Sequence, residues 1–400
     1  MTDAIMSRGR IRELDGLRGI AVSLVVLFHF FGGGDGHSIV SNNYIRWLIN
    51  RGWSGVDLFF VLSGLLIGGI ILDNPVGAHL MKVFYYRRLL RIFPLYYILL
   101  LIVIILSPFL PEVVLITSKP WVYVLYLQNF WLAWGEKIDE WLAPTWSLAV
   151  EEHFYILLPL LVIALNKRSL LWICGVAIGL AITLRSAMFI FGIQHGNSIA
   201  GFLTLCRMGD LFVGVLAALL LRDERCVRIT ENRKTKLYIF ALIFGLMMPV
   251  ITYLDLNRPT MPFTNTIGLS VYYCFYVSVI IIVVVHTRGF LASVMRSYVL
   301  CWLGVRAYSI YIFHMMALSA GVFIATKAGY STSYQSRIIA IALVLAVAAI
   351  MWRYIEGPLI KMGHRLAYAP ITPGPLDSQT ERNVHISARA GVDMDGCGAA

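Results

Sequence analysis

The chain has 400 residues, of which 59% are hydrophobic and only 14% are charged. A soluble protein of this size carries roughly 25% charged residues to cover its surface, so the composition excludes a cytosolic enzyme, a nucleic-acid-binding domain and a disordered chain. The net charge of +11 fits the basic cytoplasmic loops of a membrane protein, and we expect no nucleic-acid partner.

Taken in chain order, the apolar runs predict an all-α, polytopic membrane protein with about ten transmembrane helices, because they reach or approach the roughly 20 residues that cross a bilayer. Residues 121–134 are apolar and aromatic but contain Gln128 and Asn129. We therefore expect one re-entrant or interfacial segment there, with an eleventh span as the alternative. The predicted spans are 19–33, 55–72, 93–110, 146–165, 170–191, 201–221, 237–254, 266–286, 299–325 and 336–355.

The distribution of basic residues predicts the orientation. With the N-terminus inside, 23 of the 33 lysines and arginines fall in cytoplasmic segments and 7 in outer segments, which places both termini in the cytoplasm. The chain then divides into a cytoplasmic segment 1–18, a transmembrane domain 19–365 and a cytoplasmic tail 366–400 that is expected to be disordered. The six cysteines form no C-x-x-C pair, so we expect neither a disulfide framework nor a zinc site.

An ionisable side chain inside a span costs several kcal/mol unless it is paired or hydrated, so each one is a candidate functional residue. Arg18 and His29 are eleven positions apart, which on a helix places them on one face, about 16 Å apart along the axis. A guanidinium near the cytoplasmic entrance can hold a phosphate, and an imidazole deeper in the membrane can move a proton. Spacing alone leaves open that His29 is a structural residue.

Two further stretches also carry polar groups. Arg88 and Arg91 lie about one turn apart, where their guanidinium groups can bind a pyrophosphate; the alternative is that they only set the topology. Ser63 follows Asp57 and precedes Gly64, in a glycine-containing stretch that allows close helix approach. The Ser63 hydroxyl can alternatively bond to its own helix.

The remaining candidates lie in later spans. Of two adjacent glutamates near the outer end of the fourth span, we favour Glu151 as the one that faces the core; the alternative is a carboxylate exposed to outer water at a helix N-terminus. Trp146 fits an anchor at the membrane interface. Asp210 and Arg207 are three positions apart and can neutralise each other, and His314 is a second histidine within the ninth span.

Together these stretches resemble acyltransferase family three, a family of integral membrane proteins that transfer O-linked acyl groups to sugars and other acceptors. The resemblance covers about residues 10–365 and includes the family's spacing of ten residues between Arg18 and His29. At His153 the sequence departs from the glutamine that is usual in the family. The matching segments are LDGLRG at 14–19, GVDLFFVLSG at 55–64, RRLLRIFP at 87–94, TWSLAVEEHFY at 145–155 and SIYIFH at 309–314.

The resemblance implies a transmembrane acyltransferase domain over 19–365, in a bacterial inner (plasma) membrane. The implied donor is cytoplasmic acyl-CoA, with acetyl as the default acyl group, and the acceptor is a hydroxyl of a glycan or glycosylated molecule. It also implies a stand-alone form, because some members carry a C-terminal soluble transferase domain that this chain lacks. We expect acyl-CoA only as a co-substrate, no permanently bound cofactor and no metal; the oligomeric state stays open.

For this reaction we expect His29 to be the general base, with a transient acyl-histidine as the alternative. Glu151 is expected to serve the catalytic centre by orienting the acceptor together with Trp146. The residues expected to hold acyl-CoA are Arg18, Arg88, Arg91 and Ser63, of which Ser63 would steady the oxyanion or line the donor tunnel; the residues expected to be acceptor-side or structural are Trp146, Asp57, Asp210 and His314, with Asp57 paired to an intramembrane arginine.

Three other functions were weighed. A secondary transporter also has about ten spans with buried ionisable groups, but no internal repeat is visible. A lipid-linked sugar glycosyltransferase would usually need an acidic metal site in its first outer loop, where residues 34–54 offer only Asp35. A purely structural role is opposed by the number of ionisable residues inside the spans.

Overall fold

The computed structural model describes residues 11–32, 42–109, 115–164, 169–254, 263–330 and 334–368. Within these ranges the protein is helical and contains no strand. The elements are α2 (Arg12–Phe31), α3 (Asn43–Ile49), η1 (Asn50–Ser54), α4 (Gly55–Asp73), α5 (Ala78–Leu106), η2 (Ser107–Phe109), α6 (Leu115–Ser118), α7 (Trp121–Val124), α8 (Gln128–Ala133), η3 (Glu140–Leu142), α9 (Thr145–Ala164), α10 (Leu170–Ile190), α11 (Gly196–Phe202), α12 (Thr204–Leu220), α13 (Glu224–Asn232), α14 (Lys234–Leu254), η5 (Thr264–Gly268), α15 (Leu269–Val285), α16 (Phe290–Met295), α17 (Tyr298–Val305), α18 (Ala307–Lys327), α19 (Tyr334–Met351), η6 (Trp352–Glu356) and α20 (Gly357–His364).

Ten helical stretches of the described chain are long and apolar enough to cross a membrane, which confirms the predicted fold class. The chain is therefore a multi-pass membrane protein. The stretches are Arg12–Phe31, Tyr44–Asp73, Ala78–Phe109, Thr145–Ala164, Leu170–Ile190, Gly196–Leu220, Lys234–Leu254, Thr264–Val285, Ala307–Lys327 and Tyr334–His364.

Several boundaries differ from the sequence prediction. The first span begins at Arg12, so Arg18 lies within the helix, and α5 begins at Ala78, so the basic residues before the predicted third span are also helical. Helices continue past the apolar window because their backbone hydrogen bonds form equally well at a polar end. The predicted ninth span is divided at Arg306 into α17 and α18.

The segment 121–134 forms the short helices α7 and α8. Neither is long enough to cross a membrane, and no other span begins between 110 and 144 in the described part of the chain. This arrangement does not support the eleventh span. The predicted tail lies outside the described residues from 369 onward, as does Asp35.

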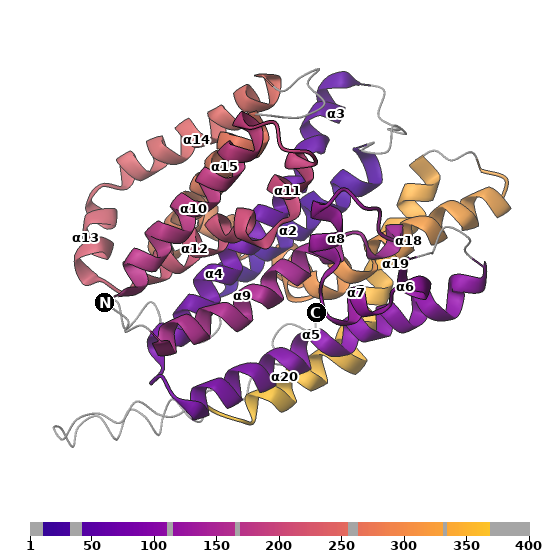
Figure 1. Cartoon of the computed structure of the whole chain (residues 1–400), viewed down its shortest axis with the longest axis horizontal. Helices are drawn as coiled ribbons and strands as arrows, with labels where there is room; N and C mark the ends of the chain where they lie inside the picture. Colours follow the sequence, from indigo (N-terminus) through magenta and orange to yellow (C-terminus); the bar gives the residue numbers. More distant parts are fainter. Residues whose placement is uncertain are drawn as a thin grey trace.

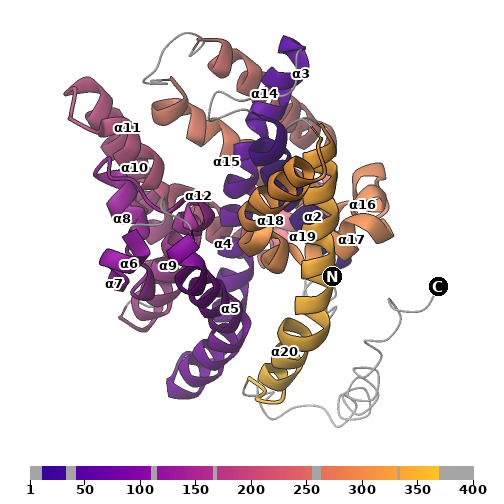
Figure 2. The same cartoon turned by 90° about the vertical axis from the view of Figure 1, so that its right-hand side faces the viewer.

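Helices α4 and α12 pack closely in the interior of the bundle. Figure 1 shows α14 along one edge and α5 with α20 along the other, and Figure 2 shows the same bundle from the side of α18 and α19. The α4–α12 approach requires glycine, because a Cβ on Gly64 would lie 1.9 Å from the carbonyl oxygen of Leu211 and one on Gly214 would lie 2.2 Å from that of Val61. Small residues at such crossings let helix backbones pack in the membrane.

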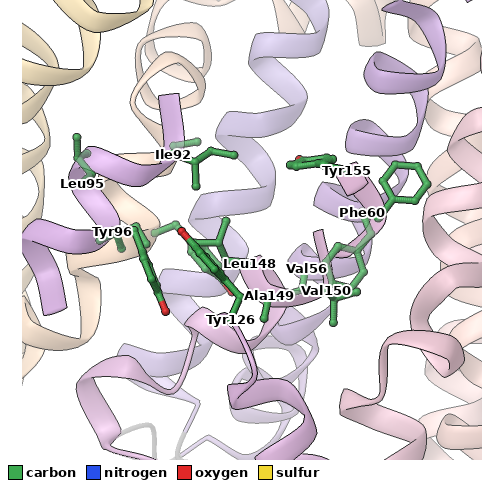
Figure 3. Close-up of a cluster of buried hydrophobic side chains, with 14 of the residues drawn as sticks. Val56, Phe60, Ile92, Leu95, Tyr96, Tyr126, Leu148, Ala149, Val150 and Tyr155 are labelled. Atoms are coloured by element: carbon green, nitrogen blue, oxygen red, sulfur yellow. The ribbon is translucent and has the colours of Figure 1, made fainter. Parts of the chain in front are cut away.

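A second part of the core is aromatic and joins α5 to the segment that contains α7 and α8, beside α9. Tyr96 and Tyr126 stack with ring centroids 4.5 Å apart and planes inclined by 20°, and Figure 3 shows both rings beside Leu148 and Ala149. The Tyr96 hydroxyl donates to the Tyr123 carbonyl oxygen at 2.8 Å. Burial raises the pKa of the Tyr126 hydroxyl above its usual range, so this ring stays neutral. These contacts hold the short helices α7 and α8 against the bundle.

Candidate active site

Two hollows enter the bundle from opposite ends. Arg18 lies in the first half of α2 and His29 lies near the C-terminal end of the same helix. The two residues therefore mark opposite ends of the bundle, which we call the Arg18 end and the His29 end. A cavity of about 1600 Å³ lies at the His29 end, and its lining includes His29, Trp146 and Asp57. A pocket of about 100 Å³ lies on the Arg18 side.

A pair of histidines lies beside the large cavity. His314 Nε2 is 3.3 Å from His29 Nδ1, and the ring centroids are 4.8 Å apart. His29 Nδ1 lies 2.9 Å from the Val25 carbonyl oxygen, and His314 Nδ1 lies 2.7 Å from the Tyr311 carbonyl oxygen. The sequence identifies both histidines as candidates, but it does not predict their contact, which joins positions 285 residues apart.

These contacts assign the protons of the neutral histidines. A carbonyl oxygen can only accept, so Nδ1 of each ring carries the hydrogen. His314 Nε2 then has a lone pair, and the single Nδ1 hydrogen of His29 is shared between the Val25 carbonyl oxygen at 2.9 Å and His314 Nε2 at 3.3 Å. His29 Nε2 is left with its own lone pair, which is the form a general base needs. The buried His314 holds this tautomer and orients the His29 ring.

The small pocket gathers the predicted donor-binding residues. Arg18, Arg88, Arg91 and Ser63 all line it, although they come from α2, α5 and α4. Arg18 Nη1 forms an ion pair with Asp15 Oδ1 at 3.2 Å. Three guanidinium groups beside one opening make this pocket suited to phosphate groups.

Glu151 belongs to the small pocket as well. Its carboxylate accepts from the Ser63 hydroxyl at 2.9 Å and from the Tyr155 hydroxyl at 2.7 Å. The structure therefore places Glu151 beside the arginines, whereas the sequence suggested a shared acceptor site with Trp146. The difference arises because Trp146 and Glu151 lie more than one turn apart on α9, and Trp146 lines the large cavity.

One side chain, Tyr311, lines both hollows within the described residues. Its hydroxyl donates to the Pro144 carbonyl oxygen at 2.8 Å and lies 2.6 Å from the Ser147 hydroxyl. Its ring centroid is 5.7 Å from that of His314. Tyr311 thus forms part of the wall between the arginine-lined pocket and the histidine-containing cavity.

The predicted pairing of Asp57 with an intramembrane arginine is present. Arg207 forms ion pairs with Asp57 and with Asp210, the latter at 2.9 Å. All three side chains are almost completely buried. Neighbouring Arg185 donates to the Cys206 carbonyl oxygen at 2.7 Å. Charges this deep in a bundle persist only in such pairs, so this cluster primarily joins α4 to α12.

Three residues of the site were not predicted from the sequence. Tyr155 stands four positions after Glu151, a spacing that predicts contact on a helix. Tyr311 lies in the segment 309–314, and its spacing of three positions from His314 also predicts contact on a helix. Ser147 also lies in a quoted segment, but nothing local indicates its bond to Tyr311.

Comparison with known proteins identifies the family. A family model described as an acyltransferase domain matches residues 11–355. The chain belongs to this acyltransferase family. Its membership confirms the resemblance noted in the sequence and does not favour the transporter alternative. The matched range contains every residue of both hollows described above.

Three relatives have informative names. A Staphylococcus aureus (strain COL) protein named as a candidate O-acetyltransferase is 30% identical over 379 residues, covering 88% of this chain and 58% of the relative. Peptidoglycan O-acetyltransferase OatA of Listeria monocytogenes is 26% identical, with 89% and 57% covered. YrhL of Bacillus subtilis, named as a candidate peptidoglycan O-acetyltransferase, is 26% identical, with 89% and 56% covered.

The chain thus spans little more than half the length of these curated relatives. No solved structure matches it.

Proposed function

We propose that this protein is an O-acetyltransferase that moves an acetyl group from acetyl-CoA to a hydroxyl of a cell-wall glycan. Family membership supports acyl transfer, and the relatives' names support acetyl and a glycan acceptor. One observation carries the mechanism. An arginine-lined pocket and a histidine-containing cavity approach each other from opposite ends and share Tyr311 as a wall.

The donor enters at the Arg18 end. Arg18, Arg88 and Arg91 bind the CoA phosphates outside the narrow part of the pocket, because about 100 Å³ corresponds to roughly three water molecules at ~30 Å³ each. Only the thioester end therefore fits inside. The excess of basic residues at the Arg18 end supports an orientation in which this end, with both termini, faces the cytoplasm and the protein spans a bacterial inner membrane.

The acceptor binds in the large cavity. His29 Nε2 takes the proton of the acceptor hydroxyl, and the hydroxyl oxygen attacks the thioester carbonyl carbon. The tetrahedral oxyanion forms near Tyr311 and Ser147, whose hydroxyls turn from the Pro144 carbonyl oxygen to donate to it. The C–S bond then breaks and the ester remains on the glycan. The CoA thiolate takes up a proton from water at the Arg18 end, and the His29 imidazolium releases its proton to water at the His29 end. Tyr311 must turn aside for the reactants to meet.

His29→Ala tests the base. It should lower acetyl transfer by about 10²–10⁴-fold while acetyl-CoA binding stays at the wild-type level, because His29 does not line the donor pocket. Transfer is measured as radiolabelled acetate incorporated into glycan by the purified protein. His79→Ala, an exposed histidine, is the matched control. Near-normal turnover of His29→Ala would reject the base assignment.

The donor site has its own test. The double variant Arg88→Ala/Arg91→Ala should weaken acetyl-CoA binding, measured by calorimetry on the protein in detergent. Arg225→Ala/Arg228→Ala is the control, because these exposed arginines of α13 have the same spacing and lie at the same end. Equal donor affinity in both double variants would return Arg88 and Arg91 to a role in topology.

A further inference from the structure

The mouth of the large cavity has an excess of positive charge. Arg46 on α3 and Arg51 on η1 both line it. Asp57 is the only carboxylate in that lining, as far as the described residues go, and it forms an ion pair with Arg207. Arg51 adds a further fixed cation to this lining, and a cation at the wall of a low-dielectric cavity attracts an anion. The proposed neutral ester chemistry does not by itself require these two cations.

The Arg51 guanidinium has N–H groups that no described residue accepts from. Its guanidinium carbon is 4.1 Å from the ring centroid of Trp47, and its Nη1 donates to the Trp47 carbonyl oxygen at 2.8 Å. Its Nε and Nη2 are buried and have no hydrogen-bond partner among the described residues. Unmet N–H groups of a cation are costly, so turning this guanidinium toward an oxygen acceptor that a ligand brings into the cavity would be favoured.

The backbone fixes this arginine relative to the base. A Cβ on Gly52 would lie 2.2 Å from the Leu24 carbonyl oxygen, and one on Gly55 would lie 2.4 Å from that of Ala21. The turn that carries Arg51 is therefore pressed against α2, the helix that carries His29. A group bound at Arg51 would be held at a constant offset from the base.

We propose that Arg51, with Arg46, forms an anion site for an oxyanion group on the acceptor, so that the acceptor is an anionic glycan. The oxyanion is either a sugar carboxylate or the pyrophosphate of a lipid-linked glycan; a planar guanidinium binds both in the same two-pronged manner. Trp47, Trp53 and Trp146 also line the cavity and supply apolar faces for a sugar ring or a prenyl chain. That the bound anion is the acceptor rests on the proposed function, but anion binding at Arg51 can be measured without turnover.

The test measures binding to the purified full chain in detergent, with CoA at saturation to occupy the donor pocket. The probes are farnesyl pyrophosphate and glucuronate, and their neutral counterparts are farnesol and glucose. Arg51→Gln should weaken binding of the recognised anion by about ten-fold, equivalent to 1.4 kcal/mol. Arg51→Lys, which keeps the charge but loses the fork, should lie between. Arg353→Gln, an exposed arginine outside the cavity lining, should bind as the wild type does.

Binding of farnesyl pyrophosphate alone would support a lipid-linked glycan, and binding of glucuronate alone an acidic sugar. Equal affinity of Arg51→Gln and wild type, equal binding of the neutral counterparts, or no binding of either anion would overturn the proposal. Size-exclusion profiles exclude misfolded variants, and Arg51→Lys preserves the test if Arg51→Gln does not fold. Arg51-dependent binding without any acetyl transfer would reject the proposed function and leave the anion site standing.

Discussion

The contact between His29 and His314 yields the sharpest prediction. His314→Leu replaces the imidazole with an apolar side chain of similar volume and removes the Nε2 acceptor that lies 3.3 Å from His29 Nδ1. When His29 accepts the acceptor's proton it becomes an imidazolium, and a hydrogen bond to a charged group contributes about 1.5–3 kcal/mol. Each 1.36 kcal/mol changes the rate ten-fold, so kcat should fall by about 10- to 150-fold.

The assay separates a positioning role from a general loss of structure. The KM for acetyl-CoA should not change, because His314 does not line the donor pocket. His314→Gln retains an acceptor oxygen and should recover most of kcat, whereas thermal unfolding midpoints should be similar for both variants. Wild-type kcat in His314→Leu, or equal losses in the Leu and Gln variants, would refute the assignment of His314 as the residue that orients the base.

Two further predictions concern the wall and the helix crossing. Tyr311→Ala should join the two hollows and raise CoA release in the absence of glycan, because water gains access to the thioester. Tyr311→Phe should keep the wall and is the control. Free thiol is measured with a chromogenic reagent, and equal release by both variants would contradict the prediction. Gly64→Ala should lower the thermal midpoint and the yield of folded protein, because the added methyl group would meet the Leu211 backbone and overpacking costs about 1–3 kcal/mol or more. Gly175→Ala, with open space around it, is the control, and a similar midpoint in both variants would contradict the packing argument.

Much of the fold follows from the sequence, since long apolar runs can only be satisfied as helices in a bilayer. The number of spans was predictable for this reason. Helix ends were not, because α5 extends well beyond its apolar window and polar residues continue a helix without penalty. The division at Arg306 was also not visible in a continuous apolar run.

Contacts across the bundle could not be predicted. Spans that are hydrophobic all round show no preferred face, so the sequence could not tell which hollow Glu151 lines. Ser63 and Glu151 meet across 88 positions, and only tertiary packing of α4 and α9 determines that contact. The sequence indicates no role for Arg51, because it places this residue in an outer loop, whereas the structure makes it part of a helical turn pressed against α2.

The Tyr311 wall has an electrical consequence. Tyr311 lines both hollows, so where water fills them the membrane voltage falls mainly across the protein between them rather than across the whole bilayer. In the proposed reaction a proton is released at the His29 end and another is consumed at the Arg18 end, so each turnover exports one positive charge equivalent. Exporting it against an interior-negative voltage costs about 2.3 kcal/mol per 100 mV. Strong polarisation of the cell would therefore slow glycan acetylation, and depolarisation would speed it.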